Sequence, residues 1–171
     1  MTAAKTLRDD VLTLDRLDLS FAGGTANGRA KVWGTGSERR AIEQKLAAHG
    51  VPAARMILEV TESALMQDIE YALRMLHRLK ACGVRLAIDD FGTGYSSLSY
   101  LKRFRLDVLK IDRSFVDGIE SDESDRAIVE ATLAMAHRLG MRVVAEGVET
   151  LAQQAFLHTK GCDLLQGYLF S

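Results

Sequence analysis

Neither sign of charge is in excess in this sequence. Lysine and arginine together number 22 against 23 acidic residues, which gives a formal net charge of −1. A protein that binds nucleic acid nonspecifically needs a basic surface to meet the phosphates, so the balance argues against DNA or RNA as a partner. A nucleotide ligand would therefore have to be recognised at a local site.

Cysteine is scarce, and long apolar runs are absent. The two cysteines, Cys82 and Cys162, are far apart and each is next to a glycine, which suits a reducing compartment and buried thiols rather than a disulfide. No apolar run is long enough to span a bilayer, and the N-terminus has no charged and apolar leader. We therefore expect a cytoplasmic protein without a membrane segment in this chain.

The length and composition suit one globular domain. With 171 residues, of which 47% are hydrophobic, the chain has enough apolar material for a sizeable core.

Residues 1–36 nevertheless differ from the rest, because apolar and polar residues alternate at 11–14, 17–21 and 30–33. Asn27-Gly28 lies between the second and third of these runs and is a strong turn signal. This segment therefore predicts a β-hairpin.

Helical and strand patterns alternate from residue 37 onward. Apolar spacing predicts helices at 37–50, 69–83, 98–104, 125–139 and 151–159, and short apolar runs predict strands at 56–61, 85–88, 108–111, 142–145 and 163–165. In the helix at 125–139, the residues expected to face inward are Ile128, Val129, Leu133, Met135 and Ala136. Strands that alternate with helices favour a parallel sheet with right-handed crossovers, which leaves a barrel or an open doubly wound sheet.

Polar side chains recur at the C-terminal ends of these strands. They are Glu59 and Glu62, Asp89 and Asp90, Lys110 and Asp112, Glu146 and Glu149, and Gln166. In a β/α barrel all these ends meet on one rim, whereas an open sheet spreads them along a line, so the pattern favours the barrel. The set offers mostly oxygen ligands and no histidine, which suits Mg²⁺ or Mn²⁺ better than zinc.

Asp89 and Asp90 are the centre of this pattern. Two neighbouring carboxylates repel each other, and a fold keeps them side by side mainly where a cation or a basic group lies between them. The alternative is that the acids form structural ion pairs with arginines such as Arg113 or Arg142. For Lys110, the alternative to a site role is a surface lysine whose apolar stem lies along the protein.

Five segments, in order, closely resemble the motifs of the EAL-domain family. They are 58–63 (LEVTES), 89–98 (DDFGTGYSSL), 109–116 (LKIDRSFV), 143–150 (VVAEGVET) and 166–168 (QGY). Members of this family are bacterial phosphodiesterases that open cyclic di-GMP to linear pGpG on a modified β/α barrel. The resemblance covers residues 37–171 and implies an α/β fold, an incomplete TIM-like (β/α) barrel of the EAL type, after a divergent segment at 1–36.

The resemblance also implies a role for each matched residue. Glu59, Asp89, Asp90 and Glu146 would be metal ligands, with Asp89 bridging two ions. Lys110 would hold the attacking water and a phosphate oxygen, and Glu146 would also help to take up a proton, so these two would be catalytic. Glu149 and Gln166 would hold metal-bound waters. Glu62 would brace the loop that follows Asp90.

The implied ligands and partners follow from the same motifs. The cofactor would be Mg²⁺ or Mn²⁺ in a two-metal site, and the substrate would be cyclic di-GMP. The loop region from Phe91 to Leu98 would carry homodimer contacts, because in the family this loop couples the metal site to the dimer.

The sequence departs from the family at both ends. It has no Glu-Ala-Leu, whose glutamate is a metal ligand in the family, and it lacks the first strands and the closing helix. By spacing, Asn27 falls near a family asparagine ligand, although Asn-Gly is also the strongest short turn signal and the turn is the favoured interpretation. Loss of a ligand weakens metal binding and misplaces the water, so we expect a weak or inactive phosphodiesterase. The alternatives are a degenerate EAL module that acts by binding nucleotide or protein, and a fragment of a full enzyme.

Overall fold

The computed structural model describes residues 11–21, 24–33, 44, 46, 50, 52–92 and 98–170, with the backbone alone for 11–21, 24–33 and Leu98. Most of the helix expected at 37–50 lies outside these ranges. None of the helices in the described ranges has the length and apolar character needed to cross a bilayer. Cys82 and Cys162 are not joined by a disulfide, and both are half-buried rather than fully buried.

The strands form two sheets. The first pairs β1 (Val11–Phe21) with β2 (Gly24–Trp33) in antiparallel fashion. The second has five parallel strands in the order β3-β4-β5-β6-β7. Their bounds are β3 (Ile57–Thr61), β4 (Arg85–Phe91), β5 (Val108–Ile111), β6 (Arg142–Ala145) and β7 (Leu164–Leu165).

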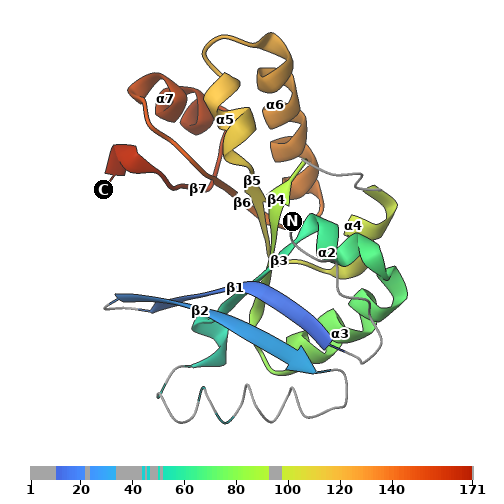
Figure 1. Ribbon diagram of the computed structural model, residues 1–171. Coiled ribbons are helices and arrows are strands. Elements are labelled where there is room, and N and C mark those ends of the chain that lie inside the picture. The colour runs from blue at the N-terminus through green and yellow to red at the C-terminus, as the bar shows by residue number, and fades with distance from the viewer. Residues whose placement is uncertain are drawn as a thin grey trace, which may run out of the picture.

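Helices connect the parallel strands. They are α2 (Glu62–Gln67), α3 (Ile69–Ala81), α4 (Leu98–Phe104), α5 (Arg113–Gly118), α6 (Glu123–Arg138) and α7 (Leu151–Thr159), with 3₁₀ turns at Ala53–Arg55 and Tyr168–Phe170. Five parallel strands in sequential order mean that the sheet is wound in one direction, as in a barrel, whereas a doubly wound sheet reverses its order at a switch point. The α/β class and the incomplete TIM-like barrel are therefore confirmed (Figure 1).

The N-terminal hairpin is confirmed, but its predicted turn is wrong. Asn27 pairs with Asp18 and Gly28 pairs with Leu17, so both lie inside β2. The pairing continues as far as Phe21 and Gly24, because the longer strands gain more pairing than a turn at Asn27-Gly28 would allow. β1 lies beside β3, at the edge of the parallel sheet (Figure 1).

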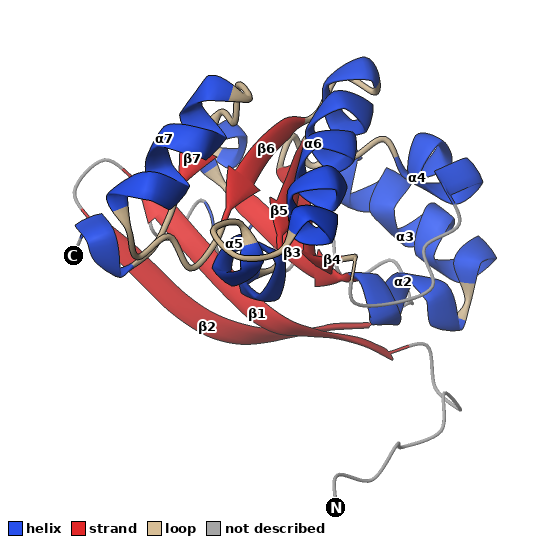
Figure 2. Ribbon diagram, turned by 90° about the horizontal axis from the view of Figure 1, so that it is seen from above, coloured by secondary structure: helices blue, strands red, loops and turns tan. Residues whose placement is uncertain are grey.

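The core lies between the parallel sheet and the helices. α3, α4 and α6 lie along one side of the sheet, and the β1–β2 ribbon lies on the other (Figure 2). From α3 and α6, the buried residues facing the sheet are Ala72, Met75, Leu76, Leu79, Val129, Leu133 and Ala136. They pack with buried strand residues such as Leu58, Ile88 and Leu109. Ile128 was expected to face inward but is 40% exposed, because the buried stripe of α6 follows residues 129, 132, 133 and 136.

Two short helices were not predicted. α2 and α5 have six residues each, which is too short for an apolar period to appear in the sequence. Local capping supports α5, because the Asp112 carboxylate accepts a hydrogen bond from the Ser114 amide at 2.9 Å. Asp112, which was counted among the polar strand ends, therefore serves as a helix cap.

Two aspartates support the N-terminal end of the sheet in the same way. Asp107 accepts a hydrogen bond from the Leu86 amide at 2.7 Å and pairs with Lys80. Asp163 accepts one from the Val143 amide at 2.8 Å, and His137 Nε2 lies 2.9 Å from the same oxygen. Each carboxylate thus satisfies the amide of the second residue of a neighbouring strand, which would otherwise lack a partner in the ladder.

Replacing Asp163 with asparagine is expected to lower the free energy of unfolding by about 1 kcal/mol at pH 7. Burial raises the pKa of Asp163, but the hydrogen bonds from Val143 and His137 and the charges of His137 and Arg142 lower it below the usual value. A carboxyl with a lowered folded pKa stabilises the fold above its unfolded pKa of about 3.9, and this stabilisation is lost as the pH falls through the folded pKa. Urea unfolding should show the difference from wild type shrinking between about pH 5 and pH 2.

Glu130→Gln is the matched control, because it also removes a carboxylate from an ion pair, with Lys160 at 2.8 Å, but holds no strand amide. It should change the free energy of unfolding by less than about 0.5 kcal/mol at either pH. A loss in Asp163→Asn that is equal at pH 7 and pH 2 would contradict the electrostatic explanation.

Candidate functional site: a carboxylate group around a buried lysine

The strand register places the candidate site residues on one face of the parallel sheet. Glu59 pairs with Ala87, Ala87 pairs with Val108, and Lys110 pairs with Val144. Paired residues in parallel strands point to the same side, and residues two apart share a face. Glu59, Asp89, Lys110 and Glu146 therefore project to the face opposite Leu58 and the other residues that pack against the helices.

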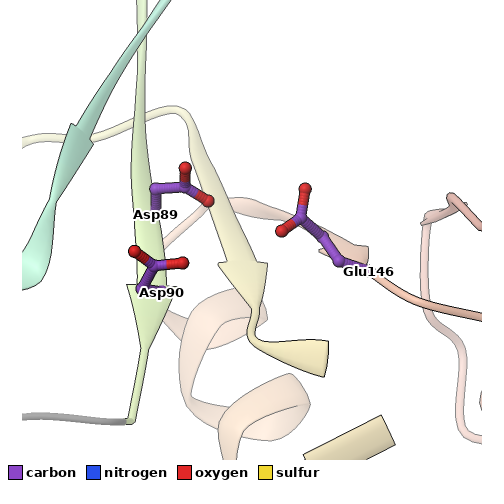
Figure 3. Close-up of side chains that lie close together, drawn as sticks. All are labelled: Asp89, Asp90 and Glu146. Atoms are coloured by element: carbon purple, nitrogen blue, oxygen red, sulfur yellow. The ribbon is translucent and has the colours of Figure 1, made fainter. Parts of the chain in front are cut away.

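Asp90 reaches this face through a local irregularity. Alternation would send the side chains of Asp89 and Asp90 to opposite faces of β4. However, the register between β4 and β5 shifts between Ile88 and Phe91, and Asp90 has a φ of +53°. Such a bulge redirects one side chain, and bulges of this kind are common next to functional sites. Figure 3 shows the carboxylates of Asp89 and Asp90 projecting from β4 toward the side from which Glu146 approaches.

Three carboxylates come close enough together to share one cation. One oxygen each from Asp89, Asp90 and Glu146 lie within 4.8 Å of one another. Glu146 follows directly after β6, and its amide donates to the Ile111 carbonyl of β5 at 3.2 Å. Backbone hydrogen bonding between neighbouring strand ends therefore fixes the position from which Glu146 reaches the two aspartates.

Lys110 lies at the centre of an overlapping set of acids. Its Nζ is 2.7 Å from Glu146 Oε1, 3.0 Å from Asp89 Oδ1 and 3.0 Å from Glu59 Oε2. Its side chain is 5% exposed, which rules out a lysine that lies along the surface. The partner of these acids is therefore Lys110, whereas Arg113 pairs with Asp117 and Glu149.

The surrounding acids keep Lys110 charged. Burial by itself lowers the pKa of Lys110, but the hydrogen bond to Glu146 and the charges of Glu146, Asp89 and Glu59 outweigh it. The pKa is therefore held above the usual value for lysine. At neutral pH the site has a fixed ammonium group on its floor.

The residues present fit a divalent cation. Three carboxylates contact a single lysine, and a fourth, that of Asp90, lies close to two of them, so negative charge is in excess at a partly buried position. Asp89 Oδ1 is buried and receives no hydrogen bond of good geometry from the described residues. All the ligand atoms are carboxylate oxygens, which hard cations prefer and zinc does not.

Glu62 and Gln166, two further predicted residues, lie next to strand ends that carry the group. Glu62 is buried, and its Oε2 accepts a hydrogen bond from the Gly92 amide at 2.9 Å, at the start of the loop it was expected to brace. Gln166 is exposed, and its amide donates to the Ala145 carbonyl at 2.9 Å, which places it beside the end of β6. The side chain of Asn27 and residues 93–97 lie outside the described parts of the structure, so the ligand role of Asn27 stays a prediction.

Arg113 was named from the sequence only as a possible ion-pair partner of the strand-end acids, and its pairing with Glu149 was not predicted. Its Nη2 is 2.8 Å from Glu149 Oε1, and its Nε is 3.1 Å from Asp117 Oδ2. The stem of Arg113 lies over Gly147, where a Cβ would meet it at less than 3.0 Å. The structure thus places Glu149 at the rim, beside an arginine rather than beside the carboxylate group.

Replacing Asp90 with alanine is expected to destabilise the protein by about 1 kcal/mol more than replacing it with glycine. Alanine is disfavoured at a φ of +53°, whereas glycine adopts it freely. The usual order in a strand is the reverse, with alanine more stable than glycine. Urea unfolding of the two variants in EDTA measures the difference.

The control is the same pair of substitutions at Thr61, whose φ is −67°. There glycine should be the less stable variant. If Asp90→Gly is also less stable than Asp90→Ala, the bulge conformation does not govern the stability at this position.

Comparison with known proteins agrees with the motifs. The sequence profile of the EAL domain matches residues 34–171. The chain belongs to the EAL domain family. Among its relatives, the cyclic di-GMP phosphodiesterase NbdA of Pseudomonas aeruginosa is 53% identical over 133 residues, which are 78% of this chain and 16% of that protein. MucR of the same organism, a bifunctional diguanylate cyclase and cyclic di-GMP phosphodiesterase, is 50% identical over 75% of this chain and 19% of its own length.

Solved structures give the same assignment. The MucR phosphodiesterase in complex with cyclic di-GMP has a TM-score of 0.76 and 47% identity, over 79% of this chain and 55% of that one. BlrP1 of Klebsiella pneumoniae, with calcium and cyclic di-GMP, has a TM-score of 0.73 and 38% identity, over 77% of this chain and 34% of that one. The chain therefore spans less than a fifth of these curated relatives and little more than half of the MucR structure.

Proposed function

We propose that this chain is an EAL-type cyclic di-GMP phosphodiesterase domain whose own residues form an incomplete two-metal site, so that it hydrolyses the substrate to pGpG slowly or not at all. The observation that carries the proposal is the group formed by Asp89, Asp90 and Glu146 beside buried Lys110, in a member of this family. The relatives named as cyclic di-GMP phosphodiesterases, and the complexes with that nucleotide, support the choice of substrate.

The chemistry joins the oxygen of water to phosphorus and breaks one P–O ester bond of the ring, whose ribose oxygen takes up a proton. Divalent cations held by Glu59, Asp89, Asp90 and Glu146 would lower the pKa of water and neutralise the phosphate. Lys110 supplies a fixed positive charge and N–H donors for the attacking water and a phosphate oxygen. Glu146 is 18% exposed, more than Glu59 or Asp89, which leaves it best placed to accept the proton of water.

The proposed weak activity follows from a ligand that this sequence does not contain. It has no Glu-Ala-Leu, and the family glutamate in that motif is a metal ligand. Ligands set geometry as well as charge, so a missing ligand leaves the cation loosely held and the water misplaced. The same absence favours a second candidate function, a degenerate module that binds the nucleotide without cleaving it.

Several finer points belong to the same proposal. The cations are Mg²⁺ or Mn²⁺, and a divalent site is supported by the calcium and manganese forms of BlrP1.

The EAL part is residues 37–171, after a separate segment at 1–36. A homodimer forms through the region from Phe91 to Leu98, and Glu149 and Gln166 bind water at the rim. The domain is cytoplasmic, in keeping with two cysteines that no disulfide joins.

The test is the conversion of cyclic di-GMP to pGpG by the purified chain with Mn²⁺, followed by chromatography. The MucR phosphodiesterase domain is assayed beside it, and we expect this chain to be at least about 10–100-fold slower. Lys110→Ala and Asp89→Ala are the controls, and any turnover of the chain should disappear in both. Turnover equal to that of MucR would contradict an incomplete site, and turnover that survives in both variants would contradict the site itself.

A calorimetric titration of the same sample with cyclic di-GMP separates the two candidate functions. Binding without turnover supports the degenerate module. Neither binding nor turnover, with and without Mn²⁺, would refute both candidates.

A further inference from the structure

A cavity of about 370 Å³ lies at the opposite end of the sheet from the carboxylate group. It lies between the C-terminal ends of α4 and α6, next to the residues that precede β5 and β6. Its floor is made by the buried side chains of Leu101, Leu106 and Met141, and Leu139 lies at its rim. The parallel strands begin here and end at the candidate active site, so the two sites are separate.

Three cations line this cavity: Lys102, Arg105 and Arg138. All three are exposed, and no described carboxylate forms a salt bridge with any of them. The nearby acids are used elsewhere, because Asp107 binds the Leu86 amide and Lys80, and Asp163 binds the Val143 amide and His137. The cavity therefore combines an apolar floor with positive charge that the surrounding described residues do not neutralise.

Helix dipoles account for two of these cations but not for the third. Lys102 and Arg138 lie in the last turns of α4 and α6, where a positive charge stabilises the helix terminus. Arg105 lies beyond α4 and has a φ of +52°, a conformation that glycine adopts far more readily. An arginine at this position costs stability, which indicates that its side chain serves a purpose other than ending the helix.

We propose that this cavity binds a small organic phosphate, a phosphate monoester that carries one ring or a short aliphatic chain. The guanidinium groups of Arg105 and Arg138 match a phosphate dianion, which planar N–H donors bind in pairs. Leu101, Leu106 and Met141 receive the apolar part of the ligand. A volume of this size is in the range of small-molecule sites. The inference does not depend on the proposed phosphodiesterase function.

The test is a ¹H–¹⁵N NMR titration of the whole chain in EDTA with phenyl phosphate, inorganic phosphate and benzyl alcohol as separate probes. Phenyl phosphate should shift the amide signals of 101–106 and 138–141 in a saturable manner, with a dissociation constant in the millimolar range or below. Inorganic phosphate lacks the ring and benzyl alcohol lacks the charge, so each should bind at least about tenfold more weakly.

Arg105→Gly is the decisive variant. Glycine relieves the positive φ, so the variant should fold at least as well as wild type, yet it should bind phenyl phosphate at least about tenfold more weakly. Arg74→Gln, which removes an exposed arginine of α3 outside the cavity, is the matched control and should leave the affinity unchanged. No saturable shift at these residues, equal binding of inorganic phosphate, or unchanged affinity in Arg105→Gly would each overturn the proposal.

Discussion

Lys110→Met is expected to lower the free energy of unfolding by about 3–5 kcal/mol when the protein is kept in EDTA. The Nζ of Lys110 lies 2.7–3.0 Å from one oxygen each of Glu59, Asp89 and Glu146, whose side chains are 10%, 8% and 18% exposed. Methionine fills a similar volume but leaves these acids close together without their shared cation. Leaving a buried charge without a partner costs far more free energy than replacing one neutral buried side chain with another.

Divalent cation should reverse much of this loss. A cation that binds the folded protein and not the unfolded chain stabilises it by mass action, and it also supplies the positive charge that the variant lacks. Saturating Mn²⁺ should therefore raise the free energy of unfolding of Lys110→Met by more than that of wild type. Urea unfolding with EDTA and with Mn²⁺ measures both effects.

Lys80→Met is the matched control for this prediction. Lys80 also pairs with an aspartate, Asp107, but the two side chains are 31% and 29% exposed. Water screens such a pair, so the loss should be about 1 kcal/mol or less, with no response to Mn²⁺. If Lys110→Met is as stable as wild type in EDTA, the carboxylates are neutralised by something other than this lysine.

Gly167→Ala is expected to cost about 3 kcal/mol and to detach the end of the chain from the strand ends that carry the site. A Cβ on residue 167 would lie less than 3.0 Å from the nitrogen and carbonyl oxygen of Val148, both of which belong to the backbone and cannot rotate away. The same peptide groups carry two hydrogen bonds at 3.0 Å, from the Val148 amide to the Gln166 carbonyl and from the Leu169 amide to the Val148 carbonyl. The methyl group therefore pushes apart the two segments that carry Glu149 and Gln166.

Hydrogen exchange and urea unfolding test this prediction together. In Gly167→Ala the amides of Val148 and Leu169 should lose their protection, while amides of the core strand β5 keep theirs below the unfolding transition. Gly161→Ala is the control, because Gly161 has a φ of +81° but open space where a Cβ would lie, so only conformational strain of about 1 kcal/mol applies. Equal effects of the two substitutions would contradict a steric origin.

The strand ends show how far the sequence predicts the site. Acidic residues and a lysine follow the short apolar runs of the sequence, and this pattern predicted that they lie together on one rim. The structure gathers Asp89, Asp90, Glu146 and Lys110 there. This prediction works because alternation and strand length are local properties, and parallel strands bring their ends together whatever the details of packing. The same reasoning predicted a barrel, and the sequential strand order agrees.

Other features depended on contacts between distant segments. Asn27-Gly28 has the local chemistry of a turn, yet it lies inside β2, because the hairpin is longer when the chain reverses before Gly24. Arg113 was named from the sequence as a possible partner of the acids, but only the approach of α5 to the segment after β6 pairs it with Glu149. Ile128 fits an apolar period but lies just outside the stripe that α6 buries.

The sequence by itself determined the α/β class and the residue types at the rim, because these follow from periodicity and from motifs a few residues long. The tertiary structure decided which carboxylate oxygens lie close to one another. Alternation alone would send Asp90 to the helix side of the sheet, and a bulge opposite Lys110 turns it toward Asp89 and Glu146. That bulge arises from the pairing of β4 with β5, two strands that meet only when the sheet has formed, so no local pattern encodes it.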